Sequence, residues 1–261
     1  MPLLELIGPP AVGKTTLVAD AVRQGARDAR RQLLRARHPL LRPVADRARR
    51  RPTGRRTVAD RLLVPPGVAA GEAALADVAD DWRDYLDLVL AGLGRPAGPS
   101  GTDRTLAIME RGWLLEAVRL RALLEPLRDG PDALLLDEGL THPYKVHAAV
   151  GPDLADVERY AQHVPLPDVL VVIDADRAAL VARLLARRRA EPGRVRWAAL
   201  PRGGDADAVA AEVDRVGTTV ATVATIAERR GGTVVRIDAS ATDPSAAVRQ
   251  LLDVTGGGGR A

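Results

Sequence analysis

Near its amino end the chain reads Gly8-Pro9-Pro10-Ala11-Val12-Gly13-Lys14-Thr15-Thr16, directly after an apolar run over residues 2–7. This turn fits the pattern G-x-x-x-x-G-K-[ST] at every fixed position. Apolar residues at helical spacing follow it as far as Arg37. We therefore expect a strand, a glycine-rich loop and a helix in that order.

The residue types of this turn suit the binding of a triphosphate. Glycines let backbone N–H groups converge on phosphate oxygens, and the start of the following helix adds positive potential. Lys14 is expected to reach the β and γ phosphates, and the Thr15 hydroxyl is expected to ligate Mg²⁺. Of the 38 basic residues only Lys14 and Lys145 are lysine. A lysine at this position is therefore more than a product of composition.

The acidic pair Asp137 and Glu138 is the second candidate feature, because it ends the short apolar run Ala133–Leu136. Such a run is typical of a strand buried on both faces. Acids at its carboxyl end lie where open α/β sheets bind ligands. Either carboxylate could act as a base or hold Mg²⁺, and Asp137 is our candidate metal ligand. The alternative is that the pair caps a helix.

The remaining sequence alternates between helical and buried-strand patterns. Strands that alternate with long helices favour a parallel sheet covered on both faces. We expect one domain over residues 1–261, with a helical substrate-binding insertion over residues 38–105. Helices are expected over 77–93, 106–127, 177–189, 209–230 and 244–254, strands over 169–173 and 233–237, and a loop over 95–103.

The order of these elements resembles the P-loop nucleoside and nucleotide kinases, with thymidylate kinase as the nearest pattern. The similarity rests on the glycine turn, the strand that ends in Asp137-Glu138-Gly139, and residues 166–174, 183–189 and 234–239. It covers residues 2–20 and 106–254. The resemblance implies a three-layer α/β/α fold with a mostly parallel five-stranded sheet, and it implies ATP and Mg²⁺ as cofactors.

Two differences from that family bear on the phosphoryl acceptor. The family has an arginine after the acid where this chain has Glu138-Gly139, and the chain lacks the phenylalanine that stacks on a nucleobase because it contains none. The acceptor is therefore expected to be another small molecule, such as a nucleoside, a nucleotide or a related natural product. The guanine-specific motif Asn-Lys-x-Asp is absent from the sequence, which favours ATP.

Arg183 and Arg187 are further candidates, because residues four apart share one helical face. The kinases that this segment resembles keep arginines over the transferred phosphate, and we expect a lid-like segment over residues 183–204. One arginine there is worth about 10³ to 10⁵ in rate. The alternative is a solvated basic helix. Our candidate catalytic residues are Lys14, Asp137, Glu138, Arg183 and Arg187.

Composition narrows the partners. The chain has no cysteine, which excludes thiol nucleophiles and disulfides and fits a reducing cytosol. We find no signal peptide and no apolar run of membrane-spanning length, so we expect a cytoplasmic protein without a membrane partner. The arginine-rich residues 23–61 could attract a polyanion, yet aromatic residues make up only 2% of the chain, which argues against nucleic acid. A homodimer stays open.

These observations lead to three hypotheses. The first is a phosphotransferase that moves the γ-phosphoryl group of MgATP to a small-molecule acceptor. The second is a P-loop ATPase with a regulatory or macromolecule-binding role, in which the acidic pair activates water. The third is a nucleotide-binding protein without catalysis. His142 and Lys145 follow the acidic pair and are candidates for substrate contact, whereas Trp82 and Tyr85 either flank a substrate ring or belong to the core.

Overall fold

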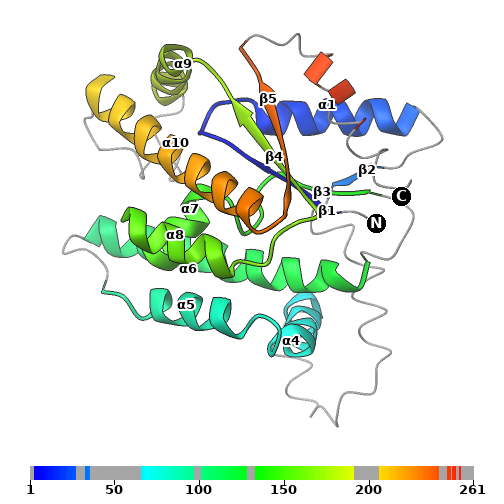
Figure 1. The fold of residues 1–261 in the computed structure, drawn as a ribbon. Coiled ribbons are helices and arrows are strands. Elements are labelled where there is room, and N and C mark those ends of the chain that lie inside the picture. The colour runs from blue at the N-terminus through cyan, green and yellow to red at the C-terminus, as the bar shows by residue number, and fades with distance from the viewer. Residues whose placement is uncertain are drawn as a thin grey trace.

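A parallel sheet forms the centre of the computed structural model (Figure 1). Its strand order is β2-β3-β1-β4-β5, and every pair of neighbours is parallel. Four strands form the body of the sheet, and the three-residue β2 pairs with β3 at one edge. The strands span Leu3–Ile7 (β1), Leu33–Arg35 (β2), Ala133–Leu136 (β3), Val169–Asp174 (β4) and Thr233–Asp238 (β5). The structure describes residues 3–27, 33–35, 66–96, 101–127, 133–190 and 206–240, together with 246, 247, 249, 250 and 253.

The strands bury side chains on both faces because successive residues of a strand point to opposite sides. Leu6 of β1 joins one apolar cluster, and Ile7 joins the other. In β4 the same alternation sends Val171 to the first cluster and Val172 to the second. Each face of the sheet therefore needs its own cover of helices.

Helices pack against both faces (Figure 1). The side of the sheet that buries Leu6 is covered by α1 and α9, and the side that buries Ile7 by α6, α7, α8 and most of α10. Helices α4 and α5 pack on α6, α7 and α8. The prediction of a parallel α/β fold is confirmed. The helices span Lys14–Arg27 (α1), Pro66–Val78 (α4), Arg83–Leu93 (α5), Gly101–Leu124 (α6), Pro143–Val150 (α7), Leu154–His163 (α8), Arg177–Ala190 (α9) and Ala206–Arg229 (α10), with a 3₁₀ turn at Glu125–Leu127.

Several predicted boundaries are wrong. The first helix was expected to reach Arg37, but α1 ends at Arg27 and Leu33–Arg35 forms β2. Two leucines and an arginine are too short a pattern to indicate a strand. The helix expected over 77–93 is interrupted between α4 and α5, where the consecutive Asp80 and Asp81 favour a turn.

Two helices were not expected at all. Helix α7 has eight residues, and Pro143 at its first position suits a helix start. Helix α8 has Asp153 as its N-cap, and the Asp153 side chain accepts a hydrogen bond from the Ala155 N–H at 3.0 Å. The spacing of its buried residues, Val157, Tyr160 and Ala161, is the signal that could have revealed it. The helix expected over 244–254, residues 38–65 and residues 191–204 lie mostly or wholly outside the described residues.

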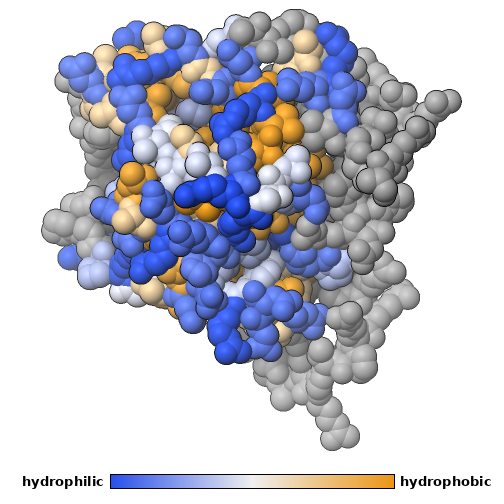
Figure 2. Space-filling model, in the orientation of Figure 1, coloured by the Kyte–Doolittle hydropathy of each residue, from blue (hydrophilic) through white to orange (hydrophobic). Residues whose placement is uncertain are grey.

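The described surface on the face shown in Figure 2 is largely hydrophilic, with smaller apolar areas between charged side chains. The larger exposed apolar side chains among the described residues are Leu90, Ile108 and Leu154. No described helix combines the length and the apolar character that crossing a membrane requires.

The contact between α5 and α7 gives a test of the packing. A methyl group at Gly92 of α5 would overlap the backbone of Ala149 in α7, so Gly92→Ala should destabilise the protein by about 1–3 kcal/mol through overpacking. Gly112 in α6 has nothing within 4 Å of an added methyl group, and Gly112→Ala should stabilise the protein by about 1 kcal/mol through helix propensity. Urea unfolding measures both, and equal effects of the two substitutions would contradict the α5–α7 contact.

Candidate phosphate-binding and transfer site

Residues 8–13 form the loop between β1 and α1. A methyl group at Gly8 would overlap the carbonyl oxygen of Ile173, so only glycine lets the loop pass this close to the end of β4. Gly13 has φ 102°, and Ala11 has φ 64°. Such left-handed residues turn backbone N–H groups inward, as an anion-binding loop requires.

Lys14 is enclosed by this loop. Its Nζ atom donates hydrogen bonds to the carbonyl oxygens of Gly8, at 2.8 Å, and Pro9, at 3.3 Å. Burial lowers the pKa of Lys14 to about 8, although the nearby carboxylates of Glu138 and Asp137 act in the opposite direction. The ammonium group is thus a positive charge held inside the turn.

The loop also exposes polar groups next to this charge. Gly13, Thr15 and Thr16 are all exposed, although they adjoin the buried Lys14. The two hydroxyl groups at the start of α1 are therefore accessible to a ligand. Residues 8–16 thus bring together backbone N–H groups, one ammonium group and two hydroxyl groups.

Asp137 and Glu138 follow β3, the strand next to β1. The sheet register pairs Glu5 of β1 with Leu136, so the acidic pair lies at the same edge of the sheet as the glycine loop. Asp137 is half-buried and Glu138 is exposed, and both interact electrostatically with Lys14. Because α7 begins only at Pro143, with His142 as its N-cap, the alternative interpretation of the acidic pair as a helix cap is wrong.

His142 and Lys145 lie close to the same group of charges. Burial, together with the positive charges of Lys14 and Lys145, lowers the pKa of His142 well below its usual range, so its imidazole ring is neutral. Burial also lowers the pKa of Lys145, and Glu138, Glu116 and Glu5 oppose that shift. Both lysines of the chain thus have Glu138 as an electrostatic neighbour.

Two further sequence candidates are arginines on the surface of the protein. Arg183 and Arg187 are exposed on α9, which packs on the sheet through Leu180 and Leu184. Beyond Ala190 the expected lid-like segment lies outside the described residues. A role of the two arginines over a phosphate therefore stays a prediction.

Trp82 and Tyr85 belong to the core. Both are buried, and their rings meet edge to face with centroids 6.3 Å apart. The Tyr85 hydroxyl lies 3.1 Å from that of Tyr160, which donates to the carbonyl oxygen of Leu140 at 2.9 Å. The core interpretation of these aromatic residues is correct.

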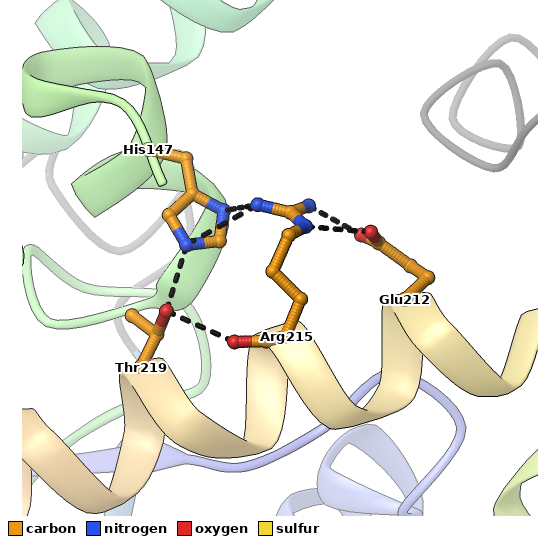
Figure 3. A network of polar contacts seen from close by, with 4 residues as sticks. All are labelled: His147, Glu212, Arg215 and Thr219. Carbon is orange, nitrogen blue, oxygen red and sulfur yellow. Dashed lines mark hydrogen bonds and ion pairs between the residues drawn. The ribbon is translucent and has the colours of Figure 1, made fainter. Parts of the chain in front are cut away.

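A polar network ties α7 to α10 (Figure 3). Arg215 forms a two-bond ion pair with Glu212, at 2.8 and 2.6 Å, and donates to Nδ1 of His147 at 2.5 Å. Because Nδ1 accepts, Nε2 of His147 carries the proton and donates to the Thr219 hydroxyl at 2.7 Å. Thr219 in turn donates to the carbonyl oxygen of Arg215 at 3.2 Å. Every member of the network has a partner.

A magnesium ion fits the donors that the site offers. The hydroxyl of Thr15 and the carboxylate of Asp137 are hard oxygen ligands, and Mg²⁺ usually takes one or two protein ligands together with waters and substrate phosphates. Within the described ranges no group of three or more His, Asp or Glu side chains gathers to hold a metal on its own.

Comparisons with known proteins add no assignment to this geometry. No protein-family model matches the chain, and no curated protein matches it.

The His147 network predicts a pH dependence. Burial and Arg215 lower the pKa of His147 to about 3 from its usual 6.5. Between pH 6.5 and about 3, His147 is protonated in the unfolded chain but stays neutral in the folded protein. The free energy of unfolding therefore decreases as the pH falls from 6.5 towards 3. His147→Gln should reduce the difference in melting temperature between pH 7 and pH 4.5. His163→Gln, at an exposed histidine, is the control and should leave this difference unchanged. An unchanged pH dependence in His147→Gln would contradict the network.

Proposed function

We propose that the protein is an ATP-dependent phosphotransferase that moves the γ-phosphoryl group of MgATP to a small-molecule acceptor. The single observation that carries the proposal is the enclosed ammonium group of Lys14, bonded to Gly8 and Pro9 and neighboured by Asp137 and Glu138. A cation beside paired carboxylates, at the carboxyl edge of a parallel sheet, suits phosphoryl transfer. We further propose that the fold is that of a P-loop kinase with a three-layer α/β/α arrangement.

Different residues of the chain have different roles in the proposed phosphoryl transfer. Backbone N–H groups of the loop and the start of α1 bind phosphate oxygens, and Lys14 neutralises charge on the β and γ phosphates. When bound, Mg²⁺ supplies additional positive charge to the phosphates, with Thr15 and Asp137 as its protein ligands. The acceptor oxygen forms a bond to the γ-phosphorus while the bond from that phosphorus to the bridging oxygen of ADP breaks. The hydroxyl proton passes to a carboxylate, for which exposed Glu138 is the candidate.

The polar groups near Glu138 support the proposal of a polar acceptor. The neutral imidazole of His142 and the carboxylate of Glu138 are both electrostatic neighbours of the Lys145 ammonium group. Such groups recognise hydroxyl, phosphate and amine functions rather than an apolar molecule. This chemistry supports the proposal of a nucleoside, a nucleotide or a related natural product as acceptor.

The exposure of Glu138 favours the ATPase hypothesis as the second candidate. An exposed carboxylate near Lys14 is able to orient a water molecule as well as an acceptor hydroxyl. The two functions differ in one measurable property, because an ATPase needs no small-molecule acceptor.

ADP formation from MgATP, measured with and without acceptors, tests the proposal. The acceptor panel contains nucleosides, nucleotides and aminoglycosides. A phosphotransferase should turn over slowly alone and at least about tenfold faster with one member of the panel, because water is a poorly positioned acceptor. Rapid turnover that no acceptor changes would favour the ATPase. Binding of MgATP without any turnover would favour a nucleotide-binding protein that has lost catalysis.

Two substitutions separate nucleotide binding from transfer. Lys14→Ala removes the enclosed charge and should weaken MgATP binding by at least about tenfold, because charge-assisted contacts to phosphate are lost. Arg187→Ala should lower kcat by about 10³-fold or more with little change in MgATP affinity, if the arginine stabilises the transferred group. Arg159→Ala is the matched control, since Arg159 is an exposed helical arginine paired with Asp156 at 2.9 Å. Calorimetry and steady-state kinetics measure these effects, and equal kcat values for the two arginine variants would contradict the role of Arg187.

A further inference from the structure

Glu5 is a charged residue in the centre of the sheet. It is the third residue of β1, paired with Leu136 of β3 on one side and Leu170 of β4 on the other, and its exposed fraction is 0%. Its neighbours along the strand are leucine and isoleucine. A buried carboxyl group disfavours folding unless hydrogen bonds replace its water. An apolar side chain is the ordinary residue at such a position, so the partners of Glu5 are informative.

Those partners lie in the turn between β3 and α7. Oε1 of Glu5 accepts a hydrogen bond from the N–H of Thr141 at 2.6 Å and another from its hydroxyl at 2.5 Å. The carboxyl group also packs against Gly139, where an added methyl group would overlap it. Oε2 is buried and has no hydrogen-bond partner among the described residues. Glu5 therefore contacts both Gly139 and Thr141 of the turn.

The middle residue of the turn is held as well. The carbonyl oxygen of Leu140 accepts the hydrogen bond from Tyr160 of α8, whose hydroxyl lies against that of Tyr85 in α5. Leu140 and Thr141 are both 0% exposed. Three consecutive backbone positions are thus fixed from inside the core, which leaves the turn little freedom to shift.

This turn connects the two halves of the candidate transfer site. Asp137 and Glu138 precede it directly, and His142 and Lys145 follow it. The glycine loop that leads to Lys14 begins at Gly8, directly after β1 and three residues after Glu5. The strand β1 therefore leads into the glycine loop and also carries Glu5, which contacts the turn Gly139–Thr141.

We propose that Glu5 is a positioning residue, which holds the turn Gly139–Thr141 and so fixes Glu138 and Lys145 relative to Lys14. Its importance for phosphoryl transfer rests on the proposed function, whereas its hold on the turn does not. An error of about 1 Å in the placement of reacting groups costs about 10²-fold in rate. A carboxyl group with two bonds to one threonine sets that spacing more narrowly than apolar packing, because hydrogen bonds are directional.

Three variants test the proposal. Glu5→Leu keeps a buried side chain of similar size and removes both hydrogen bonds. Glu5→Gln keeps a side-chain oxygen that can accept from Thr141. Leu4→Ala is the matched control, because Leu4 is buried in the same strand but belongs to the cluster on the other face of the sheet. Thr141→Val, which removes one bond and retains the branched shape, replaces Glu5→Leu if that variant does not fold.

Two readouts are independent of any activity. Hydrogen exchange of the Thr141 N–H should be at least about tenfold faster in Glu5→Leu than in the parent, because the buried acceptor is lost, and Glu5→Gln and Leu4→Ala should remain within about threefold. Acetylation by an amine-reactive ester, followed by peptide mass spectrometry, resolves Lys14 from Lys145 without interference from other lysines. Glu5→Leu should change the acetylation rate of Lys145 more than that of Lys14.

A kinetic readout separates positioning from general stability. In Glu5→Leu the kcat for ADP formation from MgATP should fall at least about tenfold, while the Kd for MgATP stays within about threefold, and Glu5→Gln should restore kcat. Unchanged Thr141 exchange in Glu5→Leu would overturn the hold on the turn. Faster exchange with an unchanged kcat would overturn the positioning role. A parent protein that binds no MgATP would refute the proposed function, and exchange and acetylation would still decide whether Glu5 holds the turn.

Discussion

The parallel pairing of β1 with β3 and β4 is the constraint on which the candidate site depends. It brings the carboxyl ends of the strands to one edge, where the glycine loop meets the acidic pair that follows β3. The enclosed ammonium group of Lys14 owes its surroundings to this edge, because its hydrogen-bond acceptors come from the loop and its electrostatic neighbours come from the adjacent strand. If β3 ran antiparallel to β1, the acidic pair would lie at the opposite edge of the sheet, about one strand length from the glycine loop.

The interior combines ordinary apolar packing with a small polar part. One cluster of buried apolar side chains lies on each face of the sheet. Within one face, Glu5, Thr141, Tyr85 and Tyr160 place hydrogen-bonding groups where apolar side chains would suffice for folding. Apolar packing is non-directional, whereas hydrogen bonds fix both distance and angle. The polar groups lie beneath the turn that separates Glu138 from Lys145, where precise spacing matters for the proposed reaction.

Some features were readable in the residues because their signals are local. The glycine pattern with Lys14, the apolar runs that became β3, β4 and β5, and the long helices α6, α9 and α10 all have a periodicity or spacing that spans enough residues to be distinctive. Helix α7 and the strand β2 were missed because they are short, so their patterns do not stand out from neighbouring turns. Helix α8 was missed although the spacing of Val157, Tyr160 and Ala161 is helical. The acidic pair was left with two interpretations, and the distance along the chain to the start of α7 removed the capping one.

Glu5 illustrates the difference between what the sequence determines and what the tertiary structure decides. By itself the sequence determined that an apolar strand with one carboxylate leads into a lysine-bearing glycine turn, and that the fold alternates strands and helices. Only the tertiary structure decided which residue that carboxylate meets, because Thr141 lies 136 positions away along the chain. It also decided that both lysines neighbour Glu138, and that Trp82 and Tyr85 belong to the core. The physical reason is that local patterns fix secondary structure, whereas contacts between distant segments follow from how the sheet orders its strands and which helix faces remain to be buried.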